Sequence, residues 1–189
     1  MDRKFIFFKD SQYLDEFNKF SDKLIYTQQN FEKFSRLVIW PNNRAIEVLK
    51  HLLKSTKERF GILYVLRASR CNNDEARYKM ENLDLNQVTD FLNEFCTFIE
   101  YDSRHRIVIR SLDEKRTYFV YDEENLLVAY GDVEQYKNIL HLLGFEEYFE
   151  KIVYPDPHMH SYHKELDKYE DKVLSYFPWI KSELMEVDR

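Results

Sequence analysis

The stretch TYFVYDEENLLVAYG, Thr117 to Gly131, contains two runs rich in β-branched and aromatic residues, with the polar sequence DEEN between them. Such runs are typical of strands, and a short polar connection between them is typical of a hairpin turn. The preceding run RIVIRS, at 106–111, alternates polar and apolar residues as a half-buried strand does. Together they predict an antiparallel meander with solvated turn carboxylates and with Arg106 and Arg110 on one solvent-facing side.

Outward from this meander, the pattern predicts further strands and several helices. The run FGILYVLRAS is nearly continuous in apolar residues, which predicts a buried strand at 60–69. Helices are expected where apolar residues recur at spacings of three and four, and two of them open with the capping-box sequences DLNQ and DVEQ. The expected helices cover 11–30, 43–56, 84–100, 132–143 and 161–176; further strands are expected at 4–8, 36–40 and 148–154, and a polar loop at 71–82.

This order of elements predicts an α+β fold with a mainly antiparallel sheet flanked by helices. The chain has only 3 Gly and 4 Pro, and it shows no internal repeat or Pro/Gly-rich linker. We therefore expect one compact domain over 1–189. Within it, 155–189 is expected to pack as a C-terminal extension whose helix forms an outer wrap.

The low glycine content bears on catalysis. Loops that hold phosphate groups need glycine, because the backbone must approach the ligand closely. The three glycines, Gly61, Gly131 and Gly144, are far apart. The sequence contains no Walker loop, GxGxxG fingerprint, GxSxG elbow, kinase signature or HExxH helix. A nucleotide-dependent enzyme of a standard type is therefore disfavoured.

Charge is unevenly distributed along the chain. Residues 1–112 hold 19 basic and 16 acidic residues, a balance of +3, whereas residues 113–189 hold 9 and 18, a balance of −9, which together give the net charge of −6. An acidic half disfavours nucleic-acid binding, which requires neutralisation of phosphates. It suits a basic protein partner, although an acidic face can also simply aid solubility.

Cysteine use and hydropathy indicate the compartment. Cys71 and Cys96 match no metal or redox spacing, and the apolar run at 5–8 is too short for a signal-peptide core. The longest apolar stretch, 61–66, is far shorter than the roughly 20 residues that a membrane helix needs. We therefore expect a cytoplasmic protein that does not bind a membrane.

Three of the six histidines lie in the segment PDPHMHSYHKELDKYED, 155–171. His158 and His160 point to the same side if the segment is extended, as the nearby prolines favour, and His163 follows three residues later. With a neighbouring carboxylate these imidazoles can hold zinc, and a metal-dependent hydrolase is one possible function. The alternatives are ordinary structural histidines and a pH-sensitive contact.

The function expected first is a protein-binding module without catalysis of its own. The general character is similar to that of small bacterial partner-binding proteins, including those that neutralise a toxin: acidic, 16% aromatic and without a cofactor motif. Besides the histidine site, a homo-oligomeric structural protein, joined through an exposed stripe that includes Phe177 and Trp179, remains open. The contacts expected for a basic partner are Asp122, Glu123, Glu124, Tyr130, Glu146, Glu147, Tyr162 and Tyr169.

Overall fold

The computed structural model describes residues 4–56, 59–113 and 117–188. The helices are α1 (Leu14–Asn18), α2 (Ala45–Lys54), α3 (Leu85–Glu94), α4 (Cys96–Tyr101), α5 (Val133–Leu142) and α6 (Lys168–Tyr176), with short 3-10 turns at Lys164–Leu166 and Glu186–Asp188. The strands are β1 (Phe5–Gln12), β2 (Ile25–Asn30), β3 (Ser35–Trp40), β4 (Phe60–Leu66), β5 (Arg77–Leu83), β6 (His105–Ser111), β7 (Tyr118–Tyr121), β8 (Leu127–Tyr130), β9 (Glu146–Glu147), β10 (Asp156–His160) and β11 (Ile180–Ser182).

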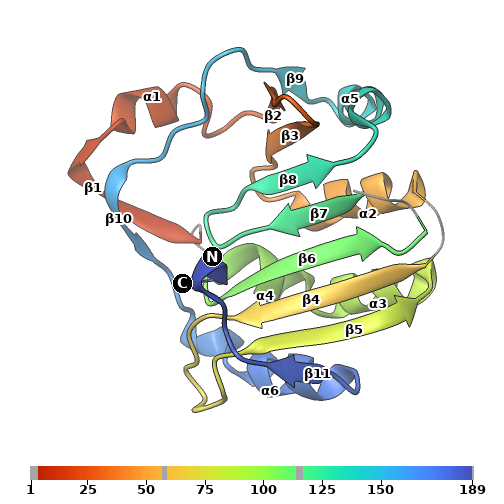
Figure 1. The fold of residues 1–189 in the computed structure, drawn as a ribbon. Helices are drawn as coiled ribbons and strands as arrows, with labels where there is room; N and C mark the ends of the chain where they lie inside the picture. The colour runs from red at the N-terminus through yellow and green to blue at the C-terminus, as the bar shows by residue number, and fades with distance from the viewer. Residues whose placement is uncertain (1–3, 57–58, 114–116, 189) are drawn as a thin grey trace.

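Most of the strands form one sheet, in the order β11-β5-β4-β6-β7-β8-β3-β2-β9 (Figure 1). Neighbouring strands are antiparallel except for β2 and β9, which are parallel. A separate ribbon consists of β1 and β10, which pair antiparallel. The predicted α+β fold with a mainly antiparallel sheet is confirmed, and so is the meander of β6, β7 and β8. Among the described helices, none has both the length and the apolar character needed to cross a membrane.

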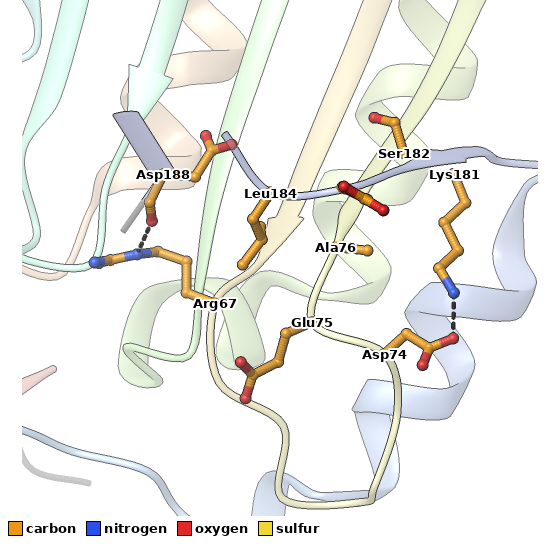
Figure 2. Close-up of a pocket in the computed structure, with 9 residues that line it drawn as sticks. Arg67, Asp74, Glu75, Ala76, Lys181, Ser182, Leu184 and Asp188 are labelled. Carbon is orange, nitrogen blue, oxygen red and sulfur yellow. Dashed lines mark hydrogen bonds and ion pairs between the residues drawn. The ribbon is translucent and has the colours of Figure 1, made fainter. Parts of the chain in front are cut away.

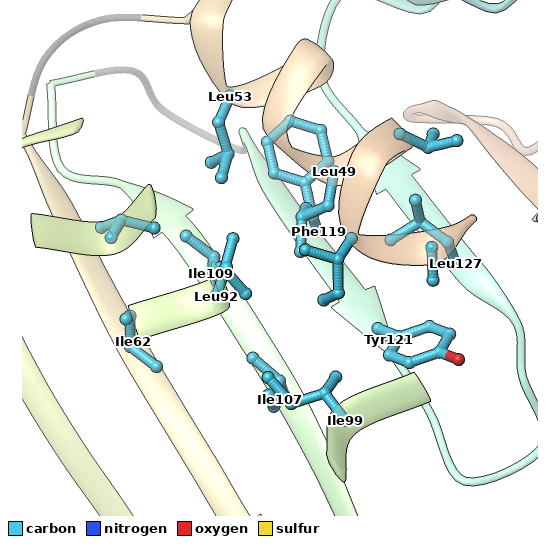
Figure 3. Close-up of a cluster of buried hydrophobic side chains, with 14 of the residues drawn as sticks. Leu49, Leu53, Ile62, Leu92, Ile99, Ile107, Ile109, Phe119, Tyr121 and Leu127 are labelled. Carbon is cyan, nitrogen blue, oxygen red and sulfur yellow. The ribbon is translucent and has the colours of Figure 1, made fainter. Parts of the chain in front are cut away.

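The main core lies between the sheet and the helices α2 to α6, which supply buried apolar residues to one face of the sheet (Figures 1 and 3). Strand β4 shows why the sequence folds this way. Ile62 and Tyr64 point into this core and have no exposed surface. Leu63 lies between them on the opposite face and is only half-buried. Side-chain alternation along each strand therefore gives the sheet a face covered by helices and a second face of different character.

Strand β3 contributes to both faces, which explains its unbroken apolar run. Leu37 and Ile39 belong to the main core, whereas Val38 and Trp40 belong to a second cluster on the other side of the sheet. That second cluster is covered by α1, by β1 and by the segment before β10, and Phe17 is its fully buried centre. The β1–β10 ribbon therefore covers one end of the face that the helices leave open.

A buried arginine, Arg104, links helix α6 to the segment that leads into β6. Arg104 has no exposed surface, and its guanidinium pairs with Asp102 at 2.8 Å, Glu170 at 2.6 Å and Asp167 at 2.8 Å. Burial alone lowers the pKa of Arg104, but its hydrogen bonds to Asp102 and Glu170 outweigh this, so the pKa is raised. A fully charged guanidinium, on the residue just before β6, therefore joins the sheet to the C-terminal segment.

Helix boundaries follow the predicted signals. Asp84 accepts from the backbone of Gln87, whose side chain accepts from Asp84 in return, so the first capping box is confirmed. Gly144, with φ of 86°, ends α5 as the left-handed cap. The single helix expected over 84–100 is two helices, α3 and α4, which meet at Phe95.

The helix predicted over 11–30 was wrong for most of its length. Only α1 is helical, and β2 occupies the end of the segment. Its residues pair with β3 along the whole strand, from Ile25 opposite Trp40 to Asn30 opposite Ser35. These inter-strand hydrogen bonds and the burial of Ile25 outweigh the apparent helical spacing of the local apolar residues.

The polar loop predicted at 71–82 contains the strand β5. Tyr78 is buried on the helix side, while Arg77 and Lys79 point to the other face. The pairing with β4 shifts register near Asn82, which has a positive φ of 60°. The charged outward positions and this bulge hide the alternation that indicates a strand.

Three expectations for the C-terminal part also need correction. Residues 148–154 form no strand but cross the second cluster, where Ile152 is 7% exposed. The extended segment lies later, in β10, and helix α6 begins at Lys168 rather than near 161. Phe177 and Trp179 do not form an exposed stripe, because their rings pack on Phe91 in the core at 5.6 and 5.9 Å.

Candidate functional site

The sheet face that the helices leave open carries a row of apolar side chains. Strand register places Leu63 opposite Val108, Val108 opposite Val120, and Val120 opposite Val128. All four are half-buried, whereas the neighbouring helix-side residue Ile109 has no exposed surface. The row therefore forms a continuous apolar strip across β4, β6, β7 and β8 that remains partly open to solvent.

An aromatic cluster, Phe31, Phe34, Tyr118 and Tyr130, lies at one end of this strip. Phe31 and Phe34 stack with their centroids 4.7 Å apart and are 47% and 42% exposed. Tyr118 and Tyr130 stack at 4.1 Å, and Phe34 lies 5.8 Å from Tyr130. The hairpin Phe31–Phe34 between β2 and β3 thus presents its rings next to those of the meander.

Arg36 lies in the middle of the aromatic cluster. Its guanidinium donates to the hydroxyl of Tyr130 at 2.6 Å and to the side-chain oxygen of Gln29 at 2.8 Å, and it lies 5.3 Å from the ring centre of Phe31. In residues 4–56, 59–113 and 117–188 no carboxylate pairs with it. Arg36 therefore offers a positive charge without a carboxylate at ion-pair distance among the described residues.

A shallow pocket of about 330 Å³ continues the same face towards β5 and β11. Its walls include the apolar side chains of Leu63 and Val108 and the charged ones of Lys79 and Arg110. Lys79 and Arg110 both pair with Glu81, so two cations share one carboxylate. The face as a whole combines apolar, aromatic and basic groups.

A larger pocket, of about 770 Å³, lies under the C-terminal tail (Figure 2). Lys181 pairs with Asp74 on one side of it, and Arg67 donates to the carbonyl oxygen of Asp188 at 2.6 Å on the other. The two basic side chains that line this pocket are thus held by groups in its wall, whereas Arg36 on the open sheet face has no carboxylate partner among the described residues. We therefore place the candidate binding surface on the sheet face in spite of the difference in volume.

The acidic turn between β7 and β8 is not solvated, contrary to the prediction. Glu123 is 7% exposed and pairs with Arg67 and, at 2.8 Å, with Arg106. Asp122 accepts backbone hydrogen bonds within its own turn, and its carbonyl accepts from the buried Lys4 at 2.8 Å. Burial lowers the pKa of Lys4 to about 8 and raises that of Asp122 to about 7. These groups bind the turn to the protein rather than to solvent.

The third acid of the turn, Glu124, meets two of the predicted histidines. One ligand atom each from Glu124, His158 and His160 lie within 4.8 Å of one another. Burial raises the pKa of Glu124, and the neighbouring His158 offsets part of that rise. Burial lowers the pKa of His160, and His158 lowers it further. We call this group the histidine–glutamate cluster. It lies where β10 passes the turn after β7.

His163 does not join this cluster. Its ring approaches Glu165 at 3.8 Å, and its backbone amide donates to Asp102 at 2.9 Å. The sequence therefore predicted two of the three residues that the fold brings together, and it grouped them with His163, which lies apart from them. The sequence predicts Glu124 only as a contact for a protein partner, because its distance from the histidines in the sequence gives no sign that it faces them.

The other predicted contacts are dispersed. Tyr169 packs against Phe98 at 6.0 Å and is partly buried in the main core, whereas Tyr162 is 40% exposed beside the C-terminal segment. Glu146 and Glu147 lie on β9, at the far edge of the sheet. Of the eight predicted contacts only Tyr130 lies in the aromatic cluster.

Sequence reasoning missed most of that cluster. Phe31, Phe34 and Arg36 occur in the segment FEKFSR, where two aromatic residues and an arginine adjoin a short strand. Paired aromatic residues in a polar connection were the available signal, because a turn has little core in which to bury them.

Comparison with known proteins finds no matching family model, no similar curated sequence and no similar solved structure. The function must therefore be argued from the two sites themselves.

Proposed function

We propose that this protein is a non-catalytic protein-binding module that binds its partner through the open face of the sheet. The observation that carries the proposal is the exposed stack of Phe31 and Phe34 beside Arg36, next to the stacked Tyr118 and Tyr130. Aromatic residues and arginine are enriched at the centres of protein interfaces, where a few such side chains supply most of the binding free energy.

The surroundings of the aromatic cluster support an interface. The rings stack on one another in pairs, so they lose little conformational freedom when a partner covers them. The apolar strip from Val128 to Leu63 continues the same surface across four strands. A surface of this kind can be covered by another protein, and its partly exposed apolar area favours association.

The charge of this face indicates a partner that carries carboxylates. Arg36 has no ion-pair partner among the described residues, and Arg110 and Lys79 share the single carboxylate of Glu81. Opposite charges steer association and favour one orientation of the complex. This differs from the basic partner expected from composition, because several acids of the C-terminal part are used within the protein, as in the pairs of Glu123 and Glu170 with arginines.

A toxin-neutralising protein is one form that such a module can take, and it stays part of the proposal. It rests on the general character of the sequence. Co-expression with a toxic protein encoded by a neighbouring gene tests it directly, since growth should be rescued by the wild type and not by a variant altered at Arg36.

The binding surface is tested by capture with matched variants. Purified wild type, Arg36→Glu and Lys9→Glu are immobilised and exposed to an extract of the native cells, and captured proteins are identified by mass spectrometry. Lys9 is exposed on β1, away from the aromatic cluster, so its variant changes the net charge equally. We expect one protein that wild type and Lys9→Glu retain and Arg36→Glu loses, with affinity reduced by about tenfold or more.

A Glu146→Lys variant tests the alternative of a basic partner. If capture depends on Glu146 and not on Arg36, the partner binds the acidic edge and the proposed surface is wrong. Self-association of the purified protein that Arg36→Glu abolishes would assign the face to a second copy of the chain instead, and light scattering measures this.

A further inference from the structure

The histidine–glutamate cluster brings together side chains from two separate parts of the chain. Glu124 comes from the turn after β7, whereas His158 and His160 lie two residues apart on β10 and therefore share one side of that strand. Pairing of β10 with β1 holds both histidines in register, with His158 opposite Phe7 and His160 opposite Phe5. The positions of the three donors are thus set by two strands and a buried turn.

Hydrogen bonding determines which nitrogen of His158 is free. Its Nδ1 lies 2.9 Å from the carbonyl oxygen of Pro155, which can only accept, so Nδ1 carries the hydrogen. In the neutral ring the lone pair is then on Nε2, and this atom faces Oε1 of Glu124 at 3.6 Å. Two acceptors that face each other at this distance repel unless a proton or a metal cation lies between them. Metal-binding histidines commonly donate their second ring nitrogen to a backbone carbonyl in this way.

His160 supplies the third donor and a further observation. Its Nδ1 is buried and has no hydrogen-bond partner among the described residues. A buried polar atom without a partner costs free energy, and this atom belongs to one of the two imidazole rings that would coordinate an ion in this cluster. The ring centres of His160 and His158 lie 5.4 Å apart, so the two imidazoles border the same space.

From these contacts we infer that Glu124, His158 and His160 bind a single divalent transition-metal ion, with Zn²⁺ as the preferred one. Two imidazoles and one carboxylate suit zinc and similar borderline ions, whereas Mg²⁺ and Ca²⁺ prefer oxygen ligands. A tetrahedral ion with bonds of about 2.0 Å separates its ligand atoms by about 3.3 Å, close to the 3.6 Å between His158 and Glu124. The remaining distances, up to 4.8 Å, contract by small side-chain rotations.

Three protein ligands leave a fourth position for water, which is also what a hydrolytic role would need. The site fulfils a simpler role as well, since it joins the β1–β10 ribbon to the turn of the main sheet. Glu123, the preceding residue, is already held by Arg67 and Arg106, so the turn is fixed to the main sheet before any ion binds. Metal binding therefore stabilises the folded state in which these two regions meet.

Titration with zinc tests the inference. It also distinguishes the ligand set with Glu124 from the set with His163 that the sequence alone suggests. Purified full-length protein is stripped with a chelator, dialysed and titrated with ZnCl₂ in a calorimeter; Co²⁺ absorption reports the coordination geometry. We expect one ion per chain. Glu124→Gln and His158→Ala should each weaken binding by more than the roughly 10- to 100-fold that the loss of an outer hydrogen-bond partner costs.

The matched control is His163→Ala, which alters the neighbouring histidine that the sequence alone suggests as a ligand. It should bind zinc as the wild type does. Circular dichroism and thermal unfolding of each metal-free variant show whether it is folded. If His158→Ala does not fold, the isosteric variant Glu124→Gln still tests the site. Absence of zinc binding by the folded wild type, or loss of binding in His163→Ala but not in Glu124→Gln, would overturn the inference. Neither result affects the proposed protein interface, because Arg36 and the aromatic cluster take no part in this site.

Discussion

Arg104 and Arg36 are both held by several neighbours, but the two regions around them differ in kind. Arg104 is fully buried and pairs with three carboxylates, two of which have no exposed side-chain surface. Arg36 is half-buried, and its partners are an amide, a hydroxyl and aromatic rings. The first guanidinium is neutralised within the fold, whereas the second keeps its charge available.

This difference separates structural from functional charge in the protein. Removing one member of a buried ion pair leaves an uncompensated charge in the interior, which strongly destabilises the fold. Removing a charge that faces solvent has little effect on stability, but it removes a contact from any partner that covers it. We therefore expect stability to depend on Arg104 and binding to depend on Arg36.

The largest effect is expected for Arg104→Met. The substitution leaves Asp102 and Glu170 buried without their cation, and we expect the free energy of unfolding to fall by about 3–5 kcal/mol. Urea denaturation followed by tryptophan fluorescence measures it.

The triple variant Arg104→Met, Asp102→Asn, Glu170→Gln should recover part of that loss, because it removes the charges together. A single variant as stable as the wild type would show that the region around Arg104 does not hold the C-terminal segment in place.

Acid should weaken the same region next. Burial alone raises the pKa of Glu170, but hydrogen bonds from Ser69, Asn73 and Arg104 outweigh it and hold the pKa below the ordinary value of 4.5. A carboxylate with a depressed pKa in the folded state contributes stability that is complete above 4.5 and is lost as the pH falls below that value.

Urea unfolding between about pH 6 and about pH 3 measures this loss. Glu170→Gln should show a smaller fall over that range than the wild type, because the titrating group is gone. Equal pH dependence of the two proteins would mean that other carboxylates dominate the acid response.

The smallest effect on stability is expected for Arg36→Ala, with a change within about 0.5 kcal/mol in urea denaturation. The substitution removes two hydrogen bonds to groups that water can reach and no ion pair among the described residues. A loss comparable to that of Arg104→Met would show that the aromatic cluster supports the fold rather than binds a partner.

Local patterns in the sequence were sufficient for most of the helices and central strands. The capping box at Asp84, the glycine after α5 and the DEEN turn each depend on residues a few positions apart, so they could be predicted. The strands β2 and β5 could not, because their polar or irregular segments are extended only through pairing with β3 and β4.

The candidate sites follow the same division. His158 and His160 were predicted together because alternation along an extended strand fixes their common side. Glu124 and Arg36 were not placed with their neighbours, since those contacts join segments that are distant in the sequence. The contact of Lys4 with the acidic turn also joins distant segments, because it depends on the N-terminal segment lying beside that turn.

The sequence by itself determined the fold class, the antiparallel meander, the caps of two helices and the extended spacing of two histidines, because each of these follows from short-range backbone and side-chain geometry. Only the tertiary structure decided which acids are neutralised inside the protein, which carboxylate faces the histidines and which of the described arginines has no carboxylate partner. Those outcomes depend on which strands lie side by side and on which face the helices cover, and packing across the whole sheet sets both.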